Sequence, residues 1–183
     1  MMKRTWMIAA LVLATATSGM AQRYMTRTGK VSFFSGARLE NIEAFNNEAA
    51  AVLDAKTGDM AFQVPVKSFK FEKALMQEHF NENYMESDKF PKAEFKGKIT
   101  DISKVDFTKD GTYNVSSAGK MTIHGVTKDV SVPGTITVKG KEATLNSKFR
   151  IKAAEYGIKI PAAVVGKVAE VMEVTVNSNL KAQ

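Results

Sequence analysis

Cysteine is absent from the 183-residue sequence, so disulfide bonds, a thiolate nucleophile, cysteine ligands for zinc and a lipid-modified N-terminal cysteine are all excluded. Histidine is scarce, with only His79 and His124. A metal site needs three or four converging ligands, which these two residues do not supply. The patterns GxSxG, HExxH, GxGxxG and the P-loop are missing as well. Few of the usual groups for catalysis are therefore present.

Long hydrophobic runs are missing apart from one near the N-terminus. Lys3 and Arg4 precede an apolar run over residues 6–16, and Gly19 and Ala21 are small residues of the kind that a signal peptidase recognises. The run is shorter than the ~18 to 20 residues that cross a bilayer. The sequence predicts a signal peptide over residues 1–21, cleaved after Ala21, and a single exported domain over residues 22–183.

Excess charge is small. Without the predicted signal peptide, 24 basic and 19 acidic residues remain, a formal net charge of +5. The lysines are dispersed along the predicted strands, which favours solvated strand faces over binding of nucleic acid. Attraction to an anionic lipid or a pyrophosphate group, and with it a transient contact with a membrane, stays open.

Alternation with a period of two dominates the second half of the sequence. Residues 111–123, 130–139, 143–152 and 170–181 each place apolar side chains on one face and polar side chains on the other, with glycine turns between the first three. Less regular strands are predicted over residues 25–35, 42–55, 59–69 and 92–102. The pattern predicts about eight mostly antiparallel strands, which form a sandwich or close into a barrel without exposed edges.

Two helices are predicted between the strands, over residues 72–84 and, as a short one, 161–168. In the first, Leu75, Met76 and Phe80 belong to one apolar stripe, which is typical of a helix that covers a barrel mouth. His79 stands at the edge of this stripe among acidic residues. A histidine in that position is more often a polar residue beside a core than a general base or a metal ligand.

Small residues stand at inward positions between larger apolar ones. They are Ser117, Gly119, Gly134, Ser147 and Ser178. One interpretation is a hollow barrel, in which the small side chains leave room. The other is a filled interior, in which these residues mark bulges, bends or close contacts between strands.

Three segments of the sequence, FNENYMESDKFPKAEFKGKI, GKMTIHGVTKDVSVPGTITV and EYGIKIP, occur in this order before the last strand. In them the chain resembles the YceI-like family of exported bacterial lipid-binding proteins. The most specific parts are Phe90-Pro91 followed by Ala93 and Phe95, and the segment IHGVTKDV. The resemblance implies a periplasmic, lipocalin-like antiparallel β-barrel of about eight strands, with a covering helix and a short second helix.

The resemblance also implies a ligand, a long isoprenoid or fatty-acyl lipid such as a polyisoprenoid quinone or polyprenyl phosphate, and no other cofactor. We expect the cavity to be lined by Phe62, Val64, Val66, Leu75, Met76, Phe80, Phe95, Ser117, Met121, Ile123, Gly134, Ile136, Leu145, Ser147, Phe149, Val174 and Val176. No catalytic or metal-binding residue is predicted. Secretion from the cell is the alternative to the periplasm, and the oligomeric state is open, with a homodimer among the options.

Two other functions remain open from the sequence. One is an enzyme of isoprenoid or fatty-acyl chemistry, which a perturbed pKa at His79, Glu82, Glu155 or Tyr156 would favour. The other is a secreted structural or stress-related β-protein with a filled interior and no ligand.

Overall fold

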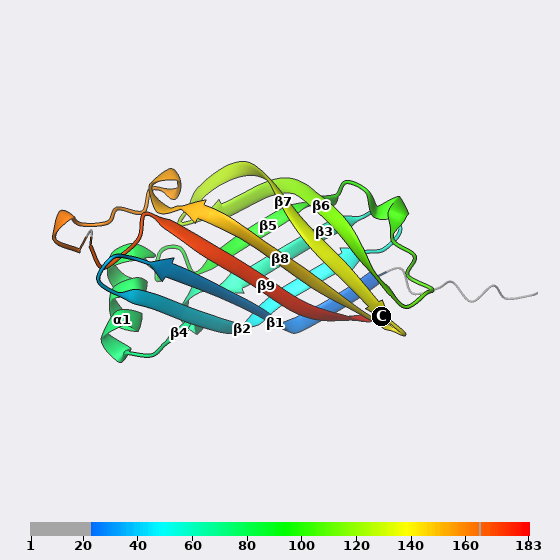
Figure 1. Ribbon diagram of the computed structural model, residues 1–183, viewed down its shortest axis with the longest axis horizontal. Helices are drawn as coiled ribbons and strands as arrows, with labels where there is room; N and C mark the ends of the chain where they lie inside the picture. Colours follow the sequence, from blue (N-terminus) through cyan, green and yellow to red (C-terminus); the bar gives the residue numbers. More distant parts are fainter. Residues whose placement is uncertain (1–22, 165) are drawn as a thin grey trace, which may run out of the picture.

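Residues 23–164 and 166–183 are described by the structure, a computed structural model (Figure 1). The predicted signal peptide lies outside the described residues. The strands are β1 (Arg23–Gly36), β2 (Asn41–Asp54), β3 (Asp59–Pro65), β4 (Lys70–Phe71), β5 (Lys92–Ile99), β6 (Gly111–Ile123), β7 (Val126–Lys139), β8 (Glu142–Lys152) and β9 (Val171–Ala182).

Eight antiparallel strands close into a barrel. The order is β1-β9-β8-β7-β6-β5-β3-β2, and β2 pairs again with β1, so the sheet has no free edge there. The two-residue strand β4 pairs with Ala44 and Phe45 of β2, beyond the part of β2 that pairs with β3. The predicted lipocalin-like fold is thus confirmed. Strand β3 ends at Pro65, four residues earlier than predicted, because proline has no N–H to continue a ladder.

One helix interrupts the strands. It runs as α1 (Ala74–His79) and continues without a break in a turn of π-helix, η2 (Phe80–Tyr84). The predicted second helix near residues 161–168 is present only as the 3-10 turn η5 (Ala162–Val164), and a further 3-10 turn, η4 (Ala153–Tyr156), follows β8. Two more 3-10 turns are η1 (Val66–Ser68) and η3 (Ile102–Lys104). No helix in the described part of the chain is long and apolar enough to cross a membrane.

The hairpin between β6 and β7 has the tight turn that the sequence predicted near Gly125. Ile123 pairs with Val126, which leaves His124 and Gly125 as a two-residue turn with φ angles of 50° and 75°. Positive φ at both central residues is the geometry that fits the twist of a hairpin. Gly125 adopts a positive φ readily. His124 is held in this conformation by two contacts of its side chain.

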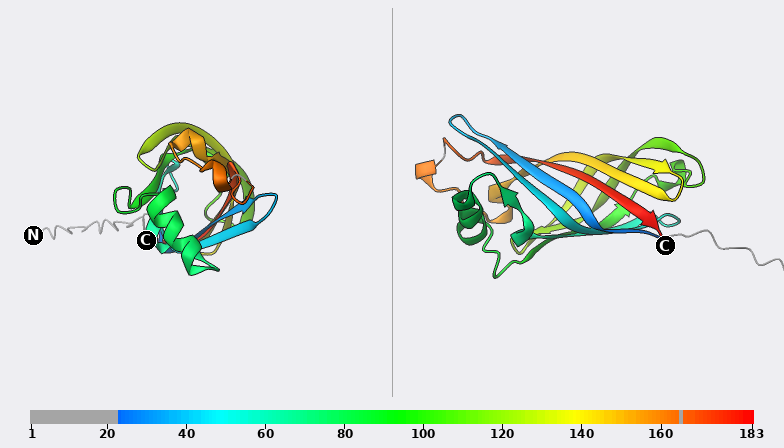
Figure 2. Two further views of the ribbon diagram at one scale, coloured as in Figure 1. Left: turned by 90° about the vertical axis from the view of Figure 1, so that its left-hand side faces the viewer. Right: turned by 90° about the horizontal axis from the view of Figure 1, so that it is seen from below.

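The two ends of the barrel differ. Near the chain termini the interior is packed by a core cluster in which Leu53, Ile136 and Leu180 have no exposed surface. The helix and residues 153–164 and 166–170 lie at the other end, where Figure 2 shows them around the rim of the barrel. Two further core clusters, one around Phe69 and Val174 and one around Phe95 and Met121, line the walls. The barrel is a cup with a packed floor and a mouth beside the helix.

Candidate functional site

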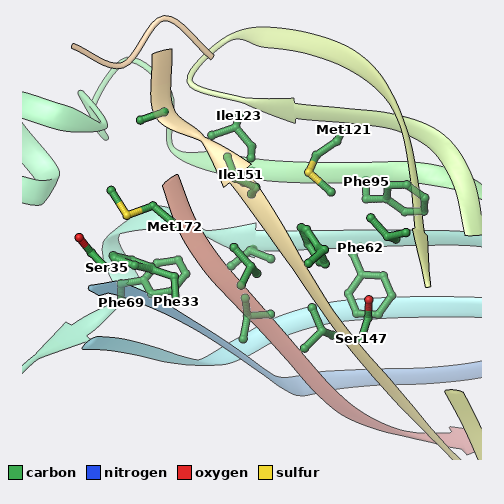
Figure 3. Close-up of a pocket in the computed structure, with 18 of the residues that line it drawn as sticks. Phe33, Ser35, Phe62, Phe69, Phe95, Met121, Ile123, Ser147, Ile151 and Met172 are labelled. Carbon is green, nitrogen blue, oxygen red and sulfur yellow. The ribbon is translucent and has the colours of Figure 1, made fainter. Parts of the chain in front are cut away.

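A cavity of about 390 Å³ occupies the barrel above the packed floor. Its size is within the range of about 300 to 1,000 Å³ that is usual for small-molecule sites. The wall is almost entirely aliphatic and aromatic, with Phe62, Phe95, Met121, Ile123 and Ile151 directed into the space (Figure 3). Such a wall removes apolar surface of a ligand from water but offers few hydrogen bonds.

Fifteen of the seventeen residues predicted to line a cavity do so in the structure. Their role in binding stays a prediction. The two exceptions are Val66 and Leu75. Val66 is buried in η1, where its backbone N–H donates to the carbonyl oxygen of Pro91 at 2.9 Å, and Leu75 faces solvent with 60% of its surface exposed. The helix turns Met76 and Phe80 inward, and Leu75 cannot share their direction because adjacent helical positions differ by about 100°.

The small inward residues divide between the two interpretations. Ser117, Gly134 and Ser147 line the cavity. Gly119 does not: it pairs with Gly97 across β5 and β6, and a side chain there would collide with backbone atoms of Lys96 and Gly97 at 2.4 Å. Ser178 is fully buried beside Gly29. A side chain at position 29 would collide with the Ser178 hydroxyl. These last two mark close strand contacts.

The hydroxyl groups of the two serines in the cavity wall are directed at backbone carbonyl oxygens. Ser147 Oγ donates to the carbonyl oxygen of Pro133 at 2.6 Å, and Ser117 Oγ approaches that of Val132 at 3.5 Å. Both bonds are made to the neighbouring strand, so the hydroxyl groups add little polarity to the cavity. The residues thereby remain small without leaving a buried donor unpaired.

The mouth is covered on one side by four phenylalanines, which the sequence analysis did not connect. Phe33 of β1 stacks on Phe80 of the helix with ring centroids 5.5 Å apart, and Phe69 and Phe71 lie 5.6 and 5.0 Å from Phe80. All four line the cavity. Phe69 and Phe71 follow the end of β3, and the short strand β4 continues along β2 in the same direction as β3, which places Phe71 opposite Ala44. This aromatic cluster fixes the helix over the mouth.

Neither histidine belongs to a catalytic arrangement among the described residues. His79 lies at the cavity rim, and its Nδ1 is 2.9 Å from Nδ2 of Asn83 on the same helix. His124 Nε2 lies 2.8 Å from a carboxylate oxygen of Glu86, and its Nδ1 lies 3.2 Å from the carbonyl oxygen of Tyr156. Within residues 23–164 and 166–183, no three side chains of His, Asp and Glu come together as a metal site would require.

Tyr156 is one of the residues that the enzyme interpretation singled out. Burial raises the pKa of its phenol, and the charge of Glu155 raises it further. A tyrosine that acts as a general base or nucleophile needs the opposite shift. The Tyr156 side chain is 3% exposed and packs against the core cluster around Phe95 and Met121. The geometry is that of a core residue.

Comparison with known proteins agrees with this architecture. The sequence model described as the YceI-like domain matches residues 14–181. A polyisoprenoid binding domain from Saccharophagus degradans, described as implicated in plant cell wall breakdown, superposes with a TM-score of 0.77 at 11% identity, over 90% of this chain and 99% of that one.

Two further solved structures have the same fold. BcnA of Burkholderia cenocepacia superposes with a TM-score of 0.68 at 21% identity, over 85% of this chain and 96% of its own. The YceI protein of Campylobacter jejuni gives a TM-score of 0.64 at 15% identity, over 81% and 89% of the two chains. Comparison with curated proteins gives no match.

Proposed function

Since the chain belongs to the YceI-like domain family, we propose that it is a carrier or storage protein that holds a long isoprenoid or fatty-acyl chain inside its barrel. The observation that carries the proposal is the apolar cavity between the packed floor and the helix. A related fold is named a polyisoprenoid binding domain in Saccharophagus degradans, which supports an isoprenoid as the first candidate.

The energetics fit a chain ligand. Burial of each CH₂ group contributes about 0.8 kcal/mol, so ten carbons contribute about 8 kcal/mol. Association costs about 4 to 15 kcal/mol in lost freedom of motion, which a chain of ten to twenty carbons offsets. A compact polar metabolite would lose its hydration in this cavity without gaining hydrogen bonds, and we exclude that class from the proposal.

Binding without catalysis is the second part of the proposal. The argument is that the ionisable groups near the cavity, His79 and Tyr156, have contacts that explain them as rim and core residues. The hollow interior also speaks against a structural β-protein, because a protein without a ligand gains stability by filling such space.

The rim of the barrel supports a transient contact with an anionic membrane. Leu39, at the tip of the β1–β2 hairpin, is 70% exposed, and its N–H donates to the carbonyl oxygen of Gly166 at 2.9 Å. This bond joins the hairpin to the segment between β8 and β9, in which residues 161–163 are exposed and apolar. Arg38, Lys159 and Lys167 are exposed around this apolar tip. Apolar side chains ringed by cations suit a surface of anionic phospholipid.

Export to the periplasm is the remaining part of the proposal. It is supported by Lys3-Arg4, the short apolar run and the small residues Gly19 and Ala21. Sequencing of the N-terminus of protein recovered from its own host tests it. An uncleaved chain in the cytoplasm contradicts export, whereas a chain that begins at Gln22 supports it.

Native mass spectrometry of protein purified without detergent tests the carrier function. We expect a lipid to remain bound at one per barrel and to leave on extraction with organic solvent. The extracted protein should then take up a fluorescent fatty acid at the same stoichiometry. Failure of the extracted, folded protein to bind both fatty-acyl and isoprenoid probes would remove the proposal and leave the structural β-protein.

A further inference from the structure

Strands β7 and β8 stop pairing halfway along their length. Ladder pairs run from Lys139 and Glu142 to Gly134 and Ser147, and none joins the rest of the two described strands, residues 126–133 and 148–152. Figure 1 shows β7 arching away from β8 toward the end of the barrel that carries the helix. The ladders on the two sides of this stretch continue past it, since β6 and β7 pair from Gly111 and Val138 to Ile123 and Val126, and β8 and β9 pair from Glu142 to Lys152.

Proline explains where the ladder ends. The carbonyl oxygen of Pro133 points toward β8, because it accepts the hydroxyl hydrogen of Ser147 at 2.6 Å. In an antiparallel strand the N–H of a residue points to the same side as its carbonyl, and proline has no N–H to donate there. The Ser147 hydroxyl takes the place of a backbone N–H of β8 as the donor to the Pro133 carbonyl. Beyond this point β7 is free to leave β8.

The separated strands frame a window in the barrel wall. At the mouth end the window is closed by η4, whose Tyr156 carbonyl is held by His124 and whose Glu155 contacts Lys128 of β7 at 3.3 Å. A pocket of about 320 Å³ lies in this window. Met121, Val132, Phe149 and Ile151 line both this pocket and the main cavity. The window and the main cavity therefore lie on the two sides of a shared apolar wall.

The outer lip of the window is cationic. Lys148, Arg150 and Lys152 alternate on the exposed face of β8, and Arg150 lines the window itself together with Ser131 of β7. Among the residues that the structure describes, Arg150 and Lys152 form no ion pair, whereas Lys148 contacts Glu173 at 2.7 Å. The other two carboxylates at this border are also occupied, Asp129 by Lys120 at 3.1 Å and Glu155 by Lys128.

We propose that the window between β7 and β8 is a headgroup subsite, in which the anionic end of an amphiphilic lipid lies against Arg150 and Lys152 while its chain enters the main cavity. This inference rests on the proposed carrier function and adds the ligand's chemistry and orientation to it. Arginine binds phosphate and carboxylate groups in a bidentate geometry. Unpaired backbone along residues 126–133 offers further polar groups at the same place. The mouth beside the helix is then the site of chain passage and not of the headgroup.

Two ligands with the same chain length but different head groups test the headgroup subsite separately from the carrier function. Displacement of a fluorescent fatty acid by dodecyl phosphate and by dodecanol gives the preference for the charged head. We expect the unaltered protein to prefer the phosphate by about tenfold, in line with a charge-assisted contact. In the double variant Arg150→Gln and Lys152→Gln the preference should fall to about twofold, with the affinity for dodecanol unchanged.

Lys96→Gln is the matched control, because Lys96 is an exposed residue on the outer face of β5 and is paired across the sheet with Lys120, away from β8. It should keep the full preference. An equal preference in the double variant and the control, or none in the unaltered protein, overturns the headgroup subsite and leaves the carrier function in place. Failure of dodecanol and dodecyl phosphate alike to bind overturns both.

The position of the headgroup can be measured directly, because the protein has no cysteine and a single introduced cysteine can be labelled selectively. A nitroxide attached to Ser131→Cys stands at the window, and one attached to Ala163→Cys stands at the apolar tip of the mouth. We expect the ³¹P signal of bound dodecyl phosphate to broaden with the label at position 131 and to remain sharp with the label at position 163. The reverse result places the headgroup at the mouth and overturns the inference even if the double variant has an effect.

Discussion

Nε2 of His124 lies 2.8 Å from Oε2 of Glu86, although the two residues are 38 positions apart in the sequence. Both have positive φ angles, 50° and 42°, so each stands at a sharp turn of the backbone. The contact ties the segment after the helix to the hairpin of β6 and β7. Phe90 packs edge-on against the His124 ring with centroids 4.6 Å apart. His124 therefore holds the segment after the helix against the β6–β7 hairpin at the mouth of the barrel.

Replacement of His124 by asparagine tests that role. Asparagine tolerates a positive φ, so the variant removes the ring without straining the turn. We expect the free energy of unfolding to fall by about 1.5 to 3 kcal/mol, the value of a hydrogen bond to a charged group, and lipid affinity to stay within about tenfold. Urea unfolding and ligand titration measure the two effects. His79→Ala, which removes a contact within one helix, should cost less; a metal lost from either variant would refute a purely structural role.

Ser147→Phe tests whether the cavity is empty space. The new ring would fill volume that a lipid chain otherwise occupies, so lipid affinity should fall at least about tenfold. The delipidated variant should melt within a few degrees of the parent, because added apolar contacts offset the lost hydrogen bond to Pro133. Ser178→Phe is the control: that serine is fully buried against Gly29, and overpacking there should cost about 1 to 3 kcal/mol. Equal melting losses in the two variants would argue that the interior is filled.

Phe80→Ala tests the aromatic cluster that holds the helix. Its ring contacts Phe33, Phe69 and Phe71, and their loss should lower stability by about 2 kcal/mol and speed the release of bound lipid. Stopped-flow displacement of a fluorescent lipid measures the release. Leu75→Ala lies on the same helix but faces solvent, and should change stability by no more than about 0.5 kcal/mol. Unchanged release in Phe80→Ala would mean that the helix does not gate the mouth.

The proposed membrane contact is tested by flotation with vesicles. Leu39→Asp combined with Ala163→Asp makes the apolar tip acidic, and binding to vesicles of phosphatidylglycerol should fall at least about fivefold. Binding of the unaltered protein should also weaken as salt is raised. Met25→Asp, at the opposite end of the barrel and 38% exposed, is the control and should bind as before. If the tip variant binds vesicles as the unaltered protein does and Met25→Asp does not, the membrane contact lies at the end of the barrel opposite to the one proposed.

Much of the fold follows from the sequence because alternation is a local property. In β6 and β8 every second residue is apolar or small, and the pattern alone assigned Met121 and Phe149 to the inner face that the structure shows. The aromatic cluster was not predictable, since Phe33 and Phe71 come together with Phe80 only through the register in which β1 and β4 both pair with Ala44 of β2. The window was hidden for a similar reason. Its cause, Pro133, is visible in the sequence, but the side of the strand from which its N–H is missing depends on the register.

Closure of the barrel joins the first described strand to the last. Tyr24 pairs with Ala182, and the N–H of Gln183 donates to the carbonyl oxygen of Arg23 at 2.9 Å. No ribosome-bound fragment that lacks β9 can therefore complete the sheet, and contacts of such long sequence separation make folding slow. Until β9 is in place, β1 and β8 each keep an unpaired edge, and such edges are where strands of different chains associate.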